Sequence, residues 1–115
     1  MMAFGKAAER VPGFSAAMPM ERMQAYADEA IATLKAMASR NRLLLLCQLI
    51  PGERSVGELA QALGLAQSVV SQHLSLLRRD GVVSGRREAQ SIYYRISDAR
   101  VQALMQTLFD QFCPN

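Results

Sequence analysis

The stretch that decides the fold is SVGELAQALGLAQSVVSQHLSLLRRDGVVSGRREAQSIYYRI, residues 55–96. Ser55 and Glu58 form a capping-box pattern, in which each side chain can satisfy a free backbone N–H at a helix start. Apolar residues then recur at helical spacing as far as Gly64, a residue type suited to ending a helix. A second helix is expected over residues 67–80. Two short helices joined by so short a turn predict a helix-turn-helix.

The second of these helices has two different faces. Val70, Leu74 and Leu77 lie on one face, which is expected to be buried. The other face is nearly free of carboxylates and rich in groups that can hydrogen-bond base edges or phosphates. It carries Gln67, Ser68, Ser71, Gln72, Ser75, Arg78 and Arg79, with His73 at its border. This pattern predicts a recognition helix that enters a groove of DNA.

A β-hairpin is expected directly after the recognition helix. Two apolar runs, at residues 82–83 and 92–96, predict two strands, and Arg86 and Arg87 lie near the tip between them. A basic hairpin in this place is typical of a wing that reaches DNA phosphates or an adjacent minor groove. The predicted fold is therefore a mainly α (α+β) winged helix-turn-helix, with about five helices and a two-stranded β-hairpin wing.

Length, composition and charge indicate the number of domains and the kind of partner. A length of 115 residues fits one domain, and a hydrophobic share of 50% suggests a buried dimer interface. The net charge of +3 is modest, but residues 67–95 hold five Arg against two acids, so the positive charge is concentrated on the expected DNA face. No segment approaches the ~20 apolar residues of a membrane span. We therefore expect a cytoplasmic protein without membrane contact.

The flanking segments complete the predicted organisation. Residues 1–19 show no period and are expected to form a flexible tail, whereas residues 20–115 are expected to form one DNA-binding and dimerisation domain. Residues 21–38 predict an amphipathic helix, and residues 40–50 predict a helix that is apolar almost all round and lies in the core. Ser97 or Asp98 is expected to cap the last helix. Long apolar first and last helices predict a homodimer that forms through both.

The runs ASRNRLLLLCQL, SVGELAQALGLAQSVVSQHLSLLRRDGVV and SIYYRI resemble the ArsR/SmtB family of winged-helix repressors. The resemblance covers about residues 21–113. It implies a homodimer that binds double-stranded operator DNA near a promoter and releases it when an inducer arrives. One departure from the family pattern is Ala66, which stands where a capping Ser is common, so that Gln67 or Ser68 is expected to cap the recognition helix. Another is Arg40-Asn41, where the family often has His-Pro or Asp-Pro.

The cysteines raise the question of the inducer. The Cys-x-Cys motif of the family's metal sensors is missing, and the chain has a single His, so we expect neither a metal site nor a cofactor. A Cys in the second helix and another at the end of the last resembles the BigR/SqrR/HlyU group of repressors. This resemblance implies that Cys47 and Cys113 sense reactive sulfur species such as persulfides. A disulfide or polysulfide bridge between them would then weaken DNA binding.

Several alternatives remain open at the level of sequence. Cys47 can be a small core residue and Cys113 a residue at a frayed helix end. The inducer can be a general oxidant such as peroxide, and the protein can act as an antirepressor of virulence-type genes rather than as a repressor. No constellation of catalytic residues is evident, so an enzyme is not expected. Base-edge contacts are assigned to Gln67, Ser68, Ser71 and Gln72 with His73 beside them, and phosphate contacts to Ser75, Arg78, Arg86 and Arg87, although each of these residues can also be ordinary solvated surface.

Overall fold

The computed structural model describes residues 18–114, and within them five helices and three strands are formed. The chain divides into two units, one reaching Ala32 and the other beginning at Thr33, and each is described by itself. Most of the predicted tail, residues 1–17, lies outside the described residues. The expected domain boundary at residue 20 stays a prediction.

Helix α2 spans Met20–Met37, which confirms the helix expected over residues 21–38. It begins after Pro19, whose carbonyl accepts hydrogen bonds from the backbone N–H groups of Arg22 and Met23. In the first unit the helix leaves Tyr26 and Ile31 exposed. The residues of α2 that belong to the second unit include Ala36 and Met37, and both are buried in that unit's core.

Helix α3 spans Arg40–Leu49 and is capped by Ser39, whose Oγ accepts a hydrogen bond from the N–H of Arg42 at 3.3 Å. Leu45, Leu46 and Leu49 are buried on one face. Leu43 and Leu44, however, are 37% and 38% exposed. The expected place of this helix in the core is therefore confirmed for one face, whereas the neighbouring elements of the unit leave the other apolar face exposed.

The helix-turn-helix is confirmed in α4, Val56–Leu63, and α5, Gln67–Arg79. The capping box is formed: Ser55 Oγ accepts from the N–H of Glu58 at 3.1 Å, and Glu58 accepts from the N–H of Ser55 at 2.8 Å. Gly64 ends α4 with a φ of 67°, in the left-handed region that a residue without Cβ adopts at low cost. The apolar face of α5 is fully buried through Val70, Leu74 and Leu77.

The cap of α5 differs from the prediction. Ala66 is the N-cap residue and makes no side-chain hydrogen bond. Its carbonyl accepts from the N–H groups of Val69 and Val70, which continue the helix. Gln67 and Ser68 do not cap, because both already lie inside the first helical turn.

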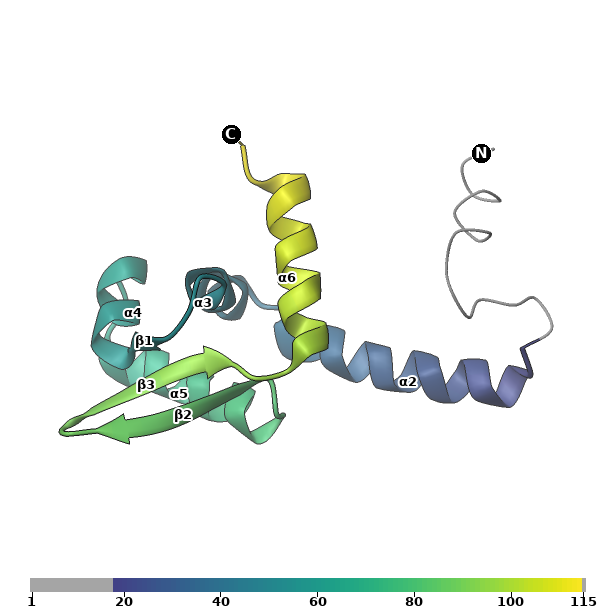
Figure 1. The fold of residues 1–115 in the computed structure, drawn as a ribbon, viewed down its shortest axis with the longest axis horizontal. Coiled ribbons are helices and arrows are strands. Elements are labelled where there is room, and N and C mark those ends of the chain that lie inside the picture. Colours follow the sequence, from purple (N-terminus) through teal and green to yellow (C-terminus); the bar gives the residue numbers. More distant parts are fainter. Residues whose placement is uncertain (1–17, 115) are drawn as a thin grey trace. The chain divides into compact units, whose positions relative to one another are not determined.

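The wing is the hairpin of β2, Val83–Glu88, and β3, Ser91–Ile96, whose backbones pair antiparallel (Figure 1). A third strand that the sequence analysis did not predict, β1 at Arg54–Ser55, pairs with β3, so the sheet has the order β1-β3-β2. This pairing ties the base of the wing to the start of α4. The sheet therefore holds the wing and the helix-turn-helix in one fixed arrangement.

The last helix, α6, spans Ala99–Phe112 and is anchored at its start. Of the two residues expected to cap this helix, Ser97 and Asp98, the N-cap is Asp98. Its side chain accepts a hydrogen bond from the N–H of Arg100 at 2.8 Å. Val101 and Met105 are fully buried, whereas Phe112 is 79% exposed. Figure 1 shows the later turns of α6 leading away from the end of β3. The helix is thus packed over its first half and largely uncovered at its end.

Candidate DNA interface and thiol pair

The recognition helix presents its predicted contact residues on one exposed surface. Six of the seven α5 residues assigned to base edges or phosphates are exposed, and the seventh, His73, is partly buried. The exposed residues are Gln67, Ser68, Ser71, Gln72, Ser75 and Arg78. These side chains are available to a ligand because the opposite face of the helix supplies all of its core packing. The only ion pair that an α5 side chain forms with a described residue joins Arg79 to Asp80, at 3.4 Å.

His73 differs from the other predicted contacts. It is partly buried, and its Nδ1 atom is buried without a hydrogen-bond partner among the described residues. One ring nitrogen therefore faces the interior of the protein. The structure places His73 at the edge of the exposed surface, as its position at the border of the polar face indicated.

On the wing, Arg86 is held by acidic neighbours. Its Nε donates to Glu53 Oε2 at 2.8 Å, its Nη1 donates to Glu88, and its guanidinium lies 5.1 Å from the centre of the Tyr93 ring. The hydrogen bonds that Arg86 donates to Glu53, and then to Glu88, raise the pKa of Arg86 above its already high value, and the same bond to Glu53 lowers the pKa of Glu53. Arg87 is exposed and forms no ion pair with any residue in the described range. Of the two predicted wing anchors, Arg87 is thus the one with an uncompensated charge.

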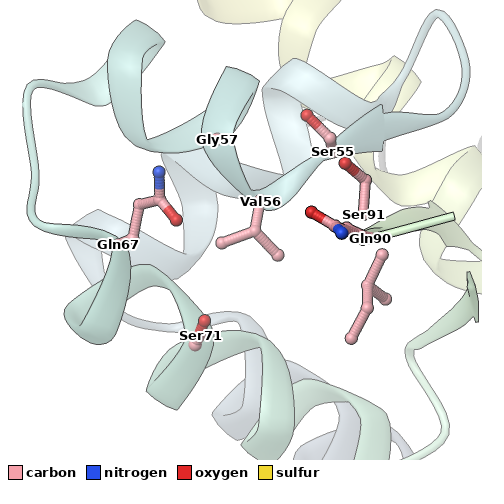
Figure 2. Close-up of a pocket in the computed structure, with 8 residues that line it drawn as sticks. Ser55, Val56, Gly57, Gln67, Ser71, Gln90 and Ser91 are labelled. Carbon is pink, nitrogen blue, oxygen red and sulfur yellow. The ribbon is translucent and has the colours of Figure 1, made fainter.

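A polar hollow of about 320 Å³ lies where the recognition helix, the start of α4 and the wing come together (Figure 2). Figure 2 shows Gln67 and Ser71 of α5 on one side of this space, and Ser55 and Ser91 on another. Its lining residues are Ser55, Val56, Gly57, Gln67, Ser71, Gln90, Ser91 and Ile92. Of these residues, the sequence predicts DNA contacts only for Gln67 and Ser71. Ser55 and Ser91 join the lining through the pairing of β1 with β3, which no local pattern indicates.

The two thiols lie in one apolar hollow of about 400 Å³ between α3 and α6. Cys47 comes from the third turn of α3 and is partly buried, and Cys113 is the exposed C-cap residue of α6. The remaining lining residues are Leu43, Met105, Leu108, Phe109, Phe112 and Pro114. Both cysteines are free thiols. Burial, and to a lesser degree the charge of Cys113, raise the pKa of Cys47, so its reactive thiolate forms less readily.

Among residues 18–114, no three His, Cys, Asp or Glu side chains lie close enough together to hold a metal ion. No helix in the described part of the chain combines the length and apolar character that a membrane crossing requires.

Residues 39–84 match the model of a family described as bacterial regulatory protein, arsR family. The transcriptional activator HlyU of Vibrio cholerae is 45% identical over 98 residues, which cover 85% of this chain and 91% of that protein. The chain belongs to the ArsR family. It is therefore a DNA-binding transcriptional regulator, and the relatives it matches are regulators of transcription rather than enzymes.

Other ArsR-family relatives give the same result. The biofilm growth-associated repressor of Xylella fastidiosa is 41% identical over 96 residues, covering 84% of this chain and 84% of that protein. The solved structure of reduced HlyU from V. cholerae matches with a TM-score of 0.79 at 45% identity, over 82% of this chain and 99% of that one. A homodimeric winged helix-turn-helix domain from Mycobacterium bovis matches with a TM-score of 0.64 at 36% identity, over 88% and 92% of the two chains. These matches confirm the winged-helix fold of this ArsR-family protein.

Proposed function

We propose that this ArsR-family regulator is a homodimeric repressor that releases operator DNA when reactive sulfur species link Cys47 to Cys113. The observation that carries the proposal is the shared hollow: residues far apart in the chain place both thiols on the lining of one cavity. The structure of one relative is described as that of reduced HlyU, and we extend a dependence on redox state from that protein to this chain.

The chemistry balances with a persulfide RSSH as the only reagent. A cysteine thiolate attacks the outer sulfur of RSSH, forms an S–S bond to it and expels RSH, which leaves a cysteine persulfide. The second thiolate attacks the protein-bound sulfur of that persulfide and expels sulfide, closing a disulfide. Two thiols and one RSSH thus yield one disulfide, one RSH and one H₂S. Each additional RSSH inserts one more sulfur into the bridge and releases one more RSH.

Inserted sulfurs relax the geometry of the bridge. A direct disulfide requires Cα atoms within roughly 7 Å of each other, whereas a polysulfide spans a wider gap. Cys113 lies at the less constrained end of α6, and Cys47 lies within the core-packed helix α3. A bridge would therefore draw the end of α6 toward α3 rather than the reverse.

DNA binding is assigned to the exposed face of α5 and to the wing. In a symmetric dimer the two recognition helices enter successive major grooves about 34–36 Å apart. Gln67, Ser68, Ser71 and Gln72 then face base edges, with His73 at their border. Ser75, Arg78, Arg86 and Arg87 contact phosphates, and Arg86 does so by exchanging a carboxylate partner for a phosphate. In the reduced state no bridge displaces α6, and the distance between the two recognition helices of the dimer matches the operator.

Release follows from a change in that spacing. The apolar terminal helices predict that α6 also forms the dimer interface. A shift of α6 would then move one recognition helix relative to the other. A difference of ~1.4 kcal/mol between the two states changes operator affinity tenfold. A small displacement of one helix is therefore enough for a functional switch.

The decisive experiment is an electrophoretic mobility shift with the full chain on its own promoter DNA. Reduced protein should bind, and treatment with an organic persulfide should release the DNA. Cys47→Ser and Cys113→Ser should stay bound after treatment, and Gln106→Ala, at an exposed position of α6 that bonds to Asp110 on the same helix, serves as a thiol-intact control that still releases. If Cys47→Ser releases DNA like the wild type, the dithiol switch is refuted.

Intact-mass spectrometry identifies the bridge and the oxidant. Each inserted sulfur adds about 32 Da to the mass of the plain disulfide form. A polysulfide after persulfide treatment, with no bridge after peroxide, is expected for a sulfur-specific sensor. An equal response to peroxide would favour a general oxidant sensor. Because HlyU is named an activator and its Xylella relative a repressor, a reporter assay in a deletion strain should test the direction of regulation, with increased expression expected.

A further inference from the structure

The hollow that holds the two thiols has an unusual lining for a site exposed to water. Apart from the cysteines, it is formed by side chains of leucine, methionine, phenylalanine and proline, and none of its eight residues carries a charged side chain. One wall comes from α3 through Leu43 and Cys47, and the other comes from the second half of α6. A reagent that reaches Cys47 must therefore pass over an apolar surface.

The two charged residues next to this hollow on α3 and α6 do not make its lining polar. Arg42 precedes Leu43 on α3, but its Nη1 donates to the carbonyl of Ala36 at 3.3 Å. Asp110 lies on the same part of α6, and its Oδ1 accepts from the amide of Gln106 at 3.1 Å on the exposed side. An anion entering the hollow would lose part of its hydration without a cationic partner among the lining residues.

We propose that this hollow selects the inducer by charge, admitting sulfur donors whose organic group is uncharged and apolar and disfavouring charged ones. The inference rests on the proposed function, because it names the class of donor that the Cys47–Cys113 pair accepts. The cavity of about 400 Å³ falls within the size range of small-molecule sites, so a short alkyl or aryl persulfide fits it. The apolar group packs against the phenylalanine and leucine side chains while the sulfur meets the thiols.

Methanethiosulfonate reagents test the charge preference directly. A thiolate attacks their sulfenyl sulfur, forms a mixed disulfide and expels methanesulfinate, and the transferred group can be neutral (ethyl), anionic (sulfonatoethyl) or cationic (trimethylammonioethyl). Rates are measured by mass spectrometry on Cys113→Ser, which reports on Cys47, and each rate is divided by that of the same protein unfolded in urea. We expect the normalised rate for the ethyl reagent to exceed both charged ones by about tenfold.

A charge introduced into the lining gives the matched test. Phe112 lines the hollow but is 79% exposed, so Phe112→Lys is compatible with the fold. In the Cys113→Ser background this variant should speed the anionic reagent and slow the cationic one. Gln106→Lys is the control, because Gln106 is also exposed on α6 but is polar and does not line the hollow. Circular dichroism of each variant verifies that the helices are retained.

The outcomes separate the inference from the proposed function. Equal normalised rates for the three reagents, or the same response in Phe112→Lys and Gln106→Lys, overturn the charge selection. So does protection of Cys47 from all three reagents that increases with protein concentration, since a second copy of the chain would then occupy the hollow. With wild-type protein, ethyl persulfide should close the bridge faster than glutathione persulfide. If neither persulfide closes it while the charge preference is present, the sensing function is refuted and the selectivity of the hollow stands.

Discussion

Replacing Gln102 by alanine should weaken the mechanical link between the thiol pair and the rest of the protein. Its Nε2 donates to the carbonyl of Ile50 at 3.2 Å, across the interface between the start of α6 and the end of α3. Ile50 is the C-cap residue of α3, the helix that carries Cys47. The two helices are therefore joined by a hydrogen bond at one end of α6 and by the thiol hollow at the other.

The size of the effect follows from this one contact. A partly buried hydrogen bond contributes about 1 kcal/mol to stability, so Gln102→Ala should lower the melting temperature by about 4–8 °C in a domain of this size. Gln106→Ala is the matched control. Gln106 lies one turn further along α6, is exposed and bonds only to Asp110 on the same helix, so its loss should change stability by less than about 0.5 kcal/mol.

The functional readout is the ratio of operator Kd values after and before persulfide treatment, measured by fluorescence anisotropy. When α6 is held less firmly at its start, part of the movement that the bridge causes is taken up there, and less of it reaches the recognition helices. A loss of about 1 kcal/mol of anchoring should reduce the ratio about fivefold in Gln102→Ala and leave it unchanged in Gln106→Ala. An unchanged ratio in Gln102→Ala, together with the expected loss of stability, would refute coupling through this contact.

Further predictions concern the thiol, the wing and the helix cap. Because burial raises the pKa of Cys47, the rate at which iodoacetamide alkylates it should increase with pH, with a midpoint above that of a free cysteine. Cys113→Ser should lower that midpoint, and mass spectrometry of quenched samples measures both rates. A midpoint at or below the ordinary value would contradict the assignment. Glu53→Gln removes one of the two carboxylates that hold Arg86 and makes its guanidinium more available to phosphate, so DNA affinity should increase and the slope of log K against log salt should steepen by up to about 1. Weaker binding would show instead that Glu53 is needed to hold the wing. Asp98→Ala should destabilise the protein by about 1 kcal/mol in urea titrations at pH 7, through loss of the N-cap of α6. The hydrogen bond from the guanidinium two residues further on lowers the pKa of Asp98, so this stabilisation is present at neutral pH and is lost as the pH falls through the lowered pKa; a variant as stable as the wild type at pH 7 would be the contrary result.

The DNA-reading part of the fold could be predicted because its signals are local. The capping box of Ser55 and Glu58 and the left-handed Gly64 each act over a few residues, and both are found in the structure. The apolar spacing of α5 likewise fixes which face is buried. Strand β1 could not be predicted in the same way, because two residues are too short to show any period and their pairing with β3 depends on tertiary structure.

Tertiary context also decides which face of α3 is covered and which partners Arg86 has. The sequence RLLLLCQL has no polar face, so it indicates a core helix but not how much of it is covered, and Leu43 and Leu44 are in fact exposed. The place of Arg86 near the hairpin tip predicts a phosphate contact but names no acidic partner. Its bidentate partner Glu53 is distant in the sequence, and no local signal joins the two.

The thiol pair shows where resemblance and geometry support each other. The sequence separation of Cys47 and Cys113 gives no information on their distance in space, and only the family pattern paired them. In the structure α6 is fixed at its start by two buried side chains, Val101 and Met105, and this fixed start determines the direction in which the rest of the helix runs. That direction carries Cys113 to the hollow beside Cys47, where the helix has few other contacts to oppose a shift. A helix that is packed at its start and largely uncovered at its end suits the proposed switch, because a bond to Cys113 would move that end without unfolding the core.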